Sequence, residues 1–305
     1  MENDFTLKNE NAGFYISAFF LVAYAVLFWS IIVRQRLTNA LTTVYKSKGP
    51  SIHYGLNLLY WGSPFFFLAL WGIASYTGLV SSRSIPTPGA VGRALWILLT
   101  SGALALEAVI SFQRVIVGFL FASLIGVSLG LAAGAFVVGR QLIRPINSFL
   151  RYIPPTAFIV LLIVYFGVGE AFKYAVVFLG IVFFIVQMVV DVVDDVDTRF
   201  IEIALTSGLS NREVFKQVIL PFSWPRIFDV LRINLSAGWT FLVAAELIGS
   251  ERGLGHFIAV SQRFLRLDDV YSGILMFGVI GLLTDFGLEL LSHKMFRWYY
   301  VALKR

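Results

Sequence analysis

The chain has 305 residues, of which 58% are hydrophobic and 14% charged, and its mean hydropathy is +0.81. A water-soluble fold of this length would lack the charge to cover its surface, so the composition predicts a membrane protein. The sequence has no cysteine, which excludes disulfides and thiolate metal sites. The formal charge of +6 is spread over many loops without one basic face, so we expect no nucleic-acid partner.

Seven apolar segments follow one another along the chain, and most are long enough to cross a hydrocarbon core of about 30 Å. They predict an all-α polytopic bundle, in which residues 1–55 form an accessory span with a cytoplasmic linker and residues 56–305 form a six-span core. The polar stretch Ser81–Gly102 is expected to be a loop. The predicted spans are Gly13–Val33, Leu56–Val80, Val115–Val138, Pro155–Val168, Tyr174–Val190, Val230–Ile248 and Val270–Leu291.

A polar segment interrupts this pattern between the fifth and sixth predicted spans, in EIALTSGLSNREVFKQVILP, residues 202–221. Its spacing predicts two short helices around Gly208. Ser210 and Glu213 have the S-x-x-E spacing of a capping box, in which each side chain satisfies a free backbone N–H at a helix start. We expect Pro221 to end the second helix, because proline has no N–H with which to continue it. Such a capped helix pair is suited to docking a soluble partner.

The same segment matches the EAA signature of ABC-importer permeases, with Ile203 in place of the usual Ala and Val218 in place of Ile. From Leu56 to the C-terminus the chain resembles the integral-membrane permeases of binding-protein-dependent ABC importers, most closely the nitrate, sulfonate, taurine and bicarbonate branch. Further matching segments are IPTPGAV, SFQRVIVGFLFASLIGVSLGLAAG, RPINSFLRYIPPTAFIVLLIVYFGVGEAFK and WTFLVAAELIGSERGLGHFI. The residues that the resemblance assigns to coupling, within a loop at about 191–229, are Glu202, Ala204, Gly208, Ser210, Glu213, Phe215, Leu220 and Pro221.

The resemblance implies a type I importer bundle and a division of labour between subunits. Two permease chains, expected to be a homodimer, would form the pore for a small inorganic or organic anion. Two ATPase subunits would dock at Glu202–Pro221, and an extracytoplasmic binding protein would deliver the solute. The sequence has no G-x-x-x-x-G-K-[ST] loop and no H-E-x-x-H pair. We therefore expect a non-enzymatic chain without metal or cofactor of its own, with ATP and Mg bound by the ATPase.

The distribution of basic residues predicts the orientation in a bacterial inner membrane. When the Glu202–Pro221 segment is placed in the cytoplasm, 15 Lys and Arg residues fall on that side and eight on the other. The positive-inside rule therefore places the N-terminus outside and the C-terminus in the cytoplasm.

Four residues near the outer ends of the spans are candidates for the translocation path or a gate. Glu246 is a carboxylate inside the sixth span, which marks either a functional site or a hydrogen bond to a neighbouring helix end. Arg114 either attracts anions or forms a local salt bridge or snorkels to the interface. Gly253 and Gly255 permit a tight turn, which is either an outer gate or an ordinary surface turn.

Small residues recur every fourth position in the third span, at Gly118, Ala122, Gly126, Gly130 and Gly134. This stripe favours close helix packing, either inside the chain or between subunits. Asp285 and Glu289 lie one turn apart in the last span. A rival hypothesis uses Glu246, Asp285 and Glu289 as relay groups of an ion-coupled transporter or channel that works without an ATPase.

Overall fold

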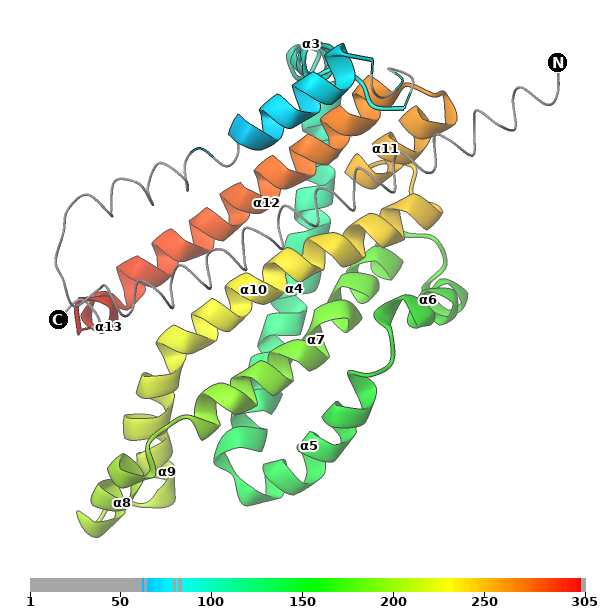
Figure 1. The fold of residues 1–305 in the computed structure, drawn as a ribbon. Helices are drawn as coiled ribbons and strands as arrows, with labels where there is room; N and C mark the ends of the chain where they lie inside the picture. Colours follow the sequence, from blue (N-terminus) through cyan, green and yellow to red (C-terminus); the bar gives the residue numbers. More distant parts are fainter. Residues whose placement is uncertain (1–61, 63–64, 79–80, 82–83, 303–305) are drawn as a thin grey trace, which may run out of the picture. The chain divides into compact units, whose positions relative to one another are not determined.

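A computed structural model of the protein describes residues 62, 65–78, 81 and 84–302 (Figure 1). The chain divides into two compact units, residues 1–93 and 94–305. Every element in the described part is helical, which confirms the predicted all-α class. The predicted accessory span and the boundary after residue 55 lie outside the described residues. In the first unit, the apolar helix Phe65–Tyr76 is joined to the chain that follows it by a hydrogen bond from the Trp71 indole to the Pro86 carbonyl (3.0 Å).

The described helices follow the chain with short connections. α3 occupies part of the stretch that was expected to be a loop, because Pro88 starts a helix well and the apolar run after it continues the turn. The helices are α3 Pro88–Thr100, α4 Ala103–Ala135, α5 Val137–Leu150, the 3₁₀ turn η1 Pro155–Phe158, α6 Ile159–Phe166, α7 Glu170–Asp194, α8 Thr198–Thr206, α9 Asn211–Val214, the π turn η2 Phe215–Ile219, α10 Leu220–Gly249, α11 Leu254–Arg263, α12 Leu267–Met295 and α13 Arg297–Ala302.

Four of these helices are long and apolar enough to cross a membrane: α4, α7, the continuous stretch Asn211–Gly249, and α12. The predicted fourth span is not one straight helix. α5 and the η1–α6 segment meet at an angle of 83°, and counting this bent pair as one span gives five among the described residues. The bend falls at Pro154, whose ψ of 127° is the extended conformation favoured before Pro155.

Among the described helices, α4 and α7 form the most extensive contact, and the glycine stripe of α4 makes it possible. A Cβ atom added at Gly118, Gly126, Gly130 or Gly134 would lie 2.6–2.8 Å from side-chain atoms of α7. The facing residues are Val177, Ile185, Val189 and Val193. Backbone and side chain therefore meet directly, as in membrane helices held by van der Waals packing. The sequence left open whether the glycine stripe packs inside the chain or between subunits, and in the structure it packs on α7 of the same chain.

The helix that starts at Asn211 does not stop at Pro221, so that part of the prediction was wrong. It continues through the π turn η2 into α10, over 39 residues to Gly249. Pro221 is the second residue of α10, inside this continuous helix, and it has no N–H to donate to the preceding turn. Directly before it, the Leu220 N–H donates to the Phe215 carbonyl, the i→i−5 bond of a π turn. This local change of hydrogen-bond register carries the helix past the proline.

The α4–α7 contact gives a direct stability prediction. Gly126→Val places methyl groups where Ile185 already lies, and overpacking of this kind costs about 1–3 kcal/mol. We expect a lower midpoint of thermal unfolding in detergent, partly restored by adding Ile185→Ala. Gly287→Val is the matched control, because no atom lies within 4 Å of a Cβ at that α12 glycine. Equal midpoints for Gly126→Val and Gly287→Val would refute the packing argument.

Candidate functional site

The segment between α7 and α10 is a folded, capped element. Asp197 caps α8, accepting from the Arg199 backbone N–H (2.9 Å), and the side-chain hydrogen bonds from Arg199 hold the pKa of the Asp197 carboxyl below its ordinary value. At α9 the predicted capping box is confirmed. The Glu213 N–H donates to Ser210 Oγ, and the Ser210 N–H donates to Glu213 Oε2 (2.8 Å). Both helices therefore start at satisfied ends.

Gly208 makes the turn between α8 and α9. Its φ is +87°, a left-handed conformation that side-chain-bearing residues rarely adopt, and nothing lies within 4 Å of a Cβ placed there. The requirement for glycine is thus one of backbone conformation and not of space. The next residue, Leu209, donates its N–H to the Ala204 carbonyl (3.1 Å), which closes the turn.

A small apolar cluster fixes this segment to the end of α7. It contains the buried residues Val193, Val196, Ala204, Val214 and Ile219. Phe215 adds an aromatic contact with Phe136, at 5.2 Å between ring centroids. On the outer side of α8, by contrast, Phe200 and Ile203 remain 54% and 62% exposed. Of the eight predicted coupling residues, Ala204 is buried, Phe215 and Leu220 are half-buried, and the other five are exposed.

Ion pairs tie the same region to α5 and α10. Asp194 binds Arg140 (2.9 Å) and Arg144 (2.7 Å) of α5, and Asp195 binds Arg226 of α10 (2.6 Å). Sequence reasoning treated these arginines only as a topology signal and the aspartates as a solvated helix end. Nothing in the sequence indicated that these arginines and aspartates form ion pairs, because the partners are 31 to 54 residues apart. The described residues contain no cluster of metal-ligand type.

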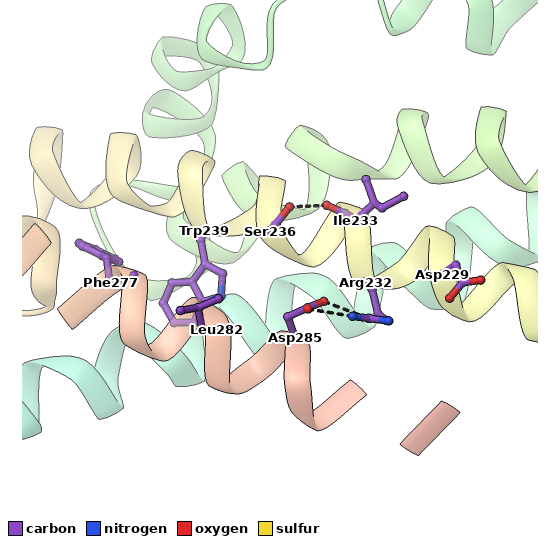
Figure 2. Close-up of a pocket in the computed structure, with 10 residues that line it drawn as sticks. Asp229, Arg232, Ile233, Ser236, Trp239, Phe277, Leu282 and Asp285 are labelled. Atoms are coloured by element: carbon purple, nitrogen blue, oxygen red, sulfur yellow. Dashed lines mark hydrogen bonds and ion pairs between the residues drawn. The ribbon is translucent and has the colours of Figure 1, made fainter. Parts of the chain in front are cut away.

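Further along α10, a cavity of about 660 Å³ opens between α10 and α12 (Figure 2). Arg232 holds the carboxylate of Asp285 with two hydrogen bonds (3.0 and 2.9 Å) and donates a third to Glu289 (2.9 Å). Asp285 and Glu289 therefore neutralise an arginine of the same chain, and their side chains stay 43% and 40% exposed. The other lining residues are Asp229, Ile233, Ser236, Trp239, Phe277, Gly278, Gly281 and Leu282.

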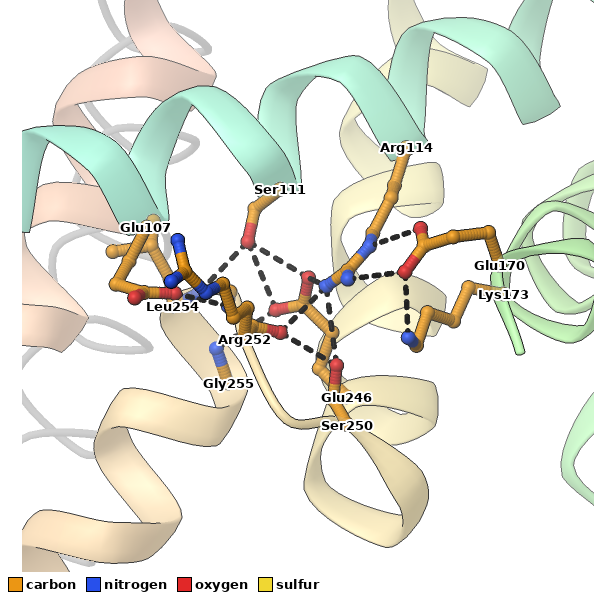
Figure 3. Close-up of polar contacts among 11 residues, drawn as sticks. Glu107, Ser111, Arg114, Glu170, Lys173, Glu246, Ser250, Arg252, Leu254 and Gly255 are labelled. Atoms are coloured by element: carbon orange, nitrogen blue, oxygen red, sulfur yellow. Dashed lines mark hydrogen bonds and ion pairs between the residues drawn. The ribbon is translucent and has the colours of Figure 1, made fainter. Parts of the chain in front are cut away.

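At the far end of α10, Glu246 is the centre of a buried charge network (Figure 3). Its carboxylate binds Arg114 (2.7 Å) and accepts from Ser111 Oγ (2.8 Å), and its side chain is fully buried. Arg114 also forms a bidentate pair with Glu170 of α7 (2.7 and 2.6 Å). Only 4% of the Arg114 side chain is exposed. Arg114 therefore forms ion pairs inside the protein and does not snorkel to the interface. It lies within α4 because that helix starts at Ala103, earlier than predicted.

The glycine turn after α10 closes over this carboxylate. Gly253 has φ +107°, and its N–H donates to Glu107, while the N–H of Leu254 donates to Ser111 Oγ (2.8 Å). The N–H of Gly255 donates directly to Glu246 (2.8 Å). Glu246 therefore sits at the N-terminus of α11, where the free N–H groups and the helix dipole favour a negative charge.

A second cavity, of about 740 Å³, adjoins the network on the side of α7 and α11. Its floor is the Arg114–Glu170 pair together with Lys173, which binds Glu170 (2.9 Å). Arg252, His256 and Arg263 line it as well, and Glu251 is the other carboxylate in the lining. The cavity is therefore richer in basic than in acidic groups. Of the four predicted gate residues, Arg114 lines this cavity, while Glu246, Gly253 and Gly255 lie beside it in the same network.

Comparisons with known proteins agree on one family. Residues 122–297 match the family model described as "Binding-protein-dependent transport system inner membrane component". The putative aliphatic sulfonates transport permease protein SsuC of Bacillus subtilis is 32% identical over 77% of this chain and 85% of its own length. The taurine transport system permease protein TauC of Escherichia coli is 31% identical over 76% of this chain and 86% of its own length. The nitrate import permease protein NrtB of Leptolyngbya laminosa is 30% identical over 57% of this chain and 63% of its own length.

A solved structure shares the fold. The chain aligns with the MetNI methionine ABC transporter in its inward-facing conformation with a TM-score of 0.51 and 19% identity, over 65% of this chain and 96% of the matched chain. The rival hypothesis of an ATPase-independent transporter is not favoured by these relatives. Its three relay candidates are moreover engaged with Arg114 or Arg232.

The buried network gives a second stability prediction. Removing one partner of a buried ion pair leaves the other uncompensated, which costs roughly 3–5 kcal/mol. Glu246→Ala is therefore expected to lower the free energy of unfolding strongly, and Glu246→Ala with Arg114→Met to lower it by less than the two single changes added together. Asp268→Asn, at an exposed carboxylate in the first turn of α12, serves as the control. Additive effects in a double-mutant cycle would show that the pair is not coupled.

Proposed function

The chain belongs to the family of binding-protein-dependent transport system inner membrane components, and from this premise we propose that it forms half of the pore of an importer for a small anion. The pore would be completed by a second copy of this chain. The solute would come from an extracytoplasmic binding protein and would be nitrate, bicarbonate, a sulfonate or a taurine-like compound. Relatives named for sulfonate, taurine and nitrate transport support this substrate range.

ATP would be hydrolysed, with Mg, by separate subunits that dock on the α8–α9 segment. The observation that carries this proposal is mechanical. The segment is capped at both helices, packed on α7, and continuous with a helix that reaches Gly249. A rigid element transmits a displacement, whereas a flexible loop would absorb it. The exposed Phe200 and Ile203 supply the apolar surface that a partner would cover.

The proposed orientation places α8 and α9 in the cytoplasm, the N-terminus outside and the C-terminus inside. Arg140, Arg144, Arg199 and Arg226 all lie at the end of the bundle that carries α8, which fits the positive-inside rule. The basic cavity at Arg252 and Arg263 would then face the binding protein, where a positive lining attracts anions.

Gly208 offers the most direct test of coupling. Gly208→Val forces a β-branched residue into a left-handed turn, at a cost of order 1–3 kcal/mol that the short α8–α9 pair is expected to relieve by changing shape. We expect the variant to insert normally and to keep ATPase activity in the assembled transporter, while solute uptake per ATP falls at least tenfold.

The matched control is Gly102→Val, at another exposed turn glycine with left-handed φ (75°) and open space around it, between α3 and α4. Uptake by this variant should stay close to that of the unmodified transporter. If Gly208→Val transports as efficiently as Gly102→Val, the docking assignment is wrong.

A further inference from the structure

The cavity between α10 and α12 contains a carboxylate that is not hydrogen-bonded. Asp229 lines it and stands one residue before the predicted span Val230–Ile248 in the helix Asn211–Gly249 (Figure 2). It makes no hydrogen bond or ion pair with another described residue, although Arg232, Arg226 and His293 are near enough to act on its charge. Carboxylates at the edge of a membrane segment are rare, and such residues typically mark binding sites or solute pathways. The other carboxylates of this region, Asp285 and Glu289, are occupied by Arg232.

Arg232 has donors to spare on the same side of α10. A guanidinium has five N–H groups, and three of those of Arg232 serve Asp285 and Glu289 through Nε and Nη2. The two N–H groups of Nη1 have no acceptor among the described residues. They remain available for an oxyanion, while 23% of the side chain is exposed.

The two groups are close enough for one small molecule to bind both. Asp229 and Arg232 are three positions apart on one helix, which places their Cβ atoms about 5–6 Å from each other. A ligand that carries an ammonium group a short alkyl spacer away from an oxyanion would satisfy both charges. Trp239, Phe277 and Leu282 provide apolar walls of the kind found in small-molecule sites.

We propose that Asp229 and Nη1 of Arg232 form a binding site for a small zwitterion, an aminoalkyl oxyanion such as an aminoalkyl sulfonate. A simple inorganic anion fits this cavity poorly, because Asp229 and Asp285 outnumber Arg232 among its ionisable lining residues. The inference rests on the proposed import function and narrows its substrate class to compounds that carry both charges. A phospholipid headgroup with an ethanolamine end has the same chemistry.

The test measures ligand affinity on the full-length protein in nanodiscs of phosphatidylglycerol, by titration with taurine, ethanesulfonate and ethylamine. A charge-assisted hydrogen bond contributes about 1.5–3 kcal/mol, so taurine should bind roughly tenfold or more tightly than either single-charge probe. Asp229→Asn should remove that advantage and leave ethanesulfonate binding unchanged or stronger. Asp268→Asn should behave like the unmodified protein.

Equal affinities for taurine and ethanesulfonate in the unmodified protein would overturn the proposal, and so would a taurine preference that survives Asp229→Asn. The first comparison needs no variant, so a folding defect cannot obscure it. If adding phosphatidylethanolamine to the discs displaces taurine, the headgroup also occupies the site; if it does not, the site is selective for the soluble compound. Neither result depends on an ATPase, so failure here leaves the coupling proposal standing.

Discussion

The helix that runs unbroken from Asn211 to Gly249 is the constraint on which the rest of the structure depends. At 1.5 Å per residue its 39 residues extend over about 58 Å. Pro221 lies nearly three turns into this helix and lacks the N–H for an i→i−4 bond, and the π turn at Phe215–Ile219 changes the hydrogen-bond register directly before it. The short polar helix α9 and the membrane span that follows it are therefore one mechanical element.

Each end of this element is held by charge. At the end that carries α8, Asp194 and Asp195 bind arginines of α5 and α10, and at the other end Glu246 joins α4 and α10 to the N-terminus of α11. The ion pairs of Asp194 and Asp195 are largely exposed, so they orient the helices but add little to the free energy of unfolding. The Glu246 network is buried. Removing one partner of a buried ion pair lowers the free energy of unfolding by far more than the intact pair adds to it relative to an apolar contact. The Glu246 network therefore specifies one arrangement of four helices, and a movement of α10 has to be shared by its neighbours.

Sequence reasoning predicted the parts that depend on local patterns. Composition identified the class, hydropathy located α4, α7, α10 and α12, and the Ser210–Glu213 spacing identified the capping box. It failed where tertiary contacts decide. Arg114 was placed at a helix mouth because a charge inside a span is unfavourable alone, and its two carboxylate partners are 56 and 132 residues away. Pro221 was expected to end a helix because single-residue rules do not include a π turn. Asp229 was overlooked because only its lack of a partner makes it notable.

The central claim is that the docking segment and the α10 span move together. Because the chain has no cysteine, spin labels can be attached to it specifically at Ser207→Cys and Thr240→Cys. The distance between them can be measured by electron–electron double resonance in transporters assembled with unlabelled partner subunits and an excess of unlabelled chain, so that each pore holds at most one labelled copy. The account predicts one narrow distance distribution that is the same with and without ATP. A broad distribution, or one that shifts when ATP binds, would contradict it.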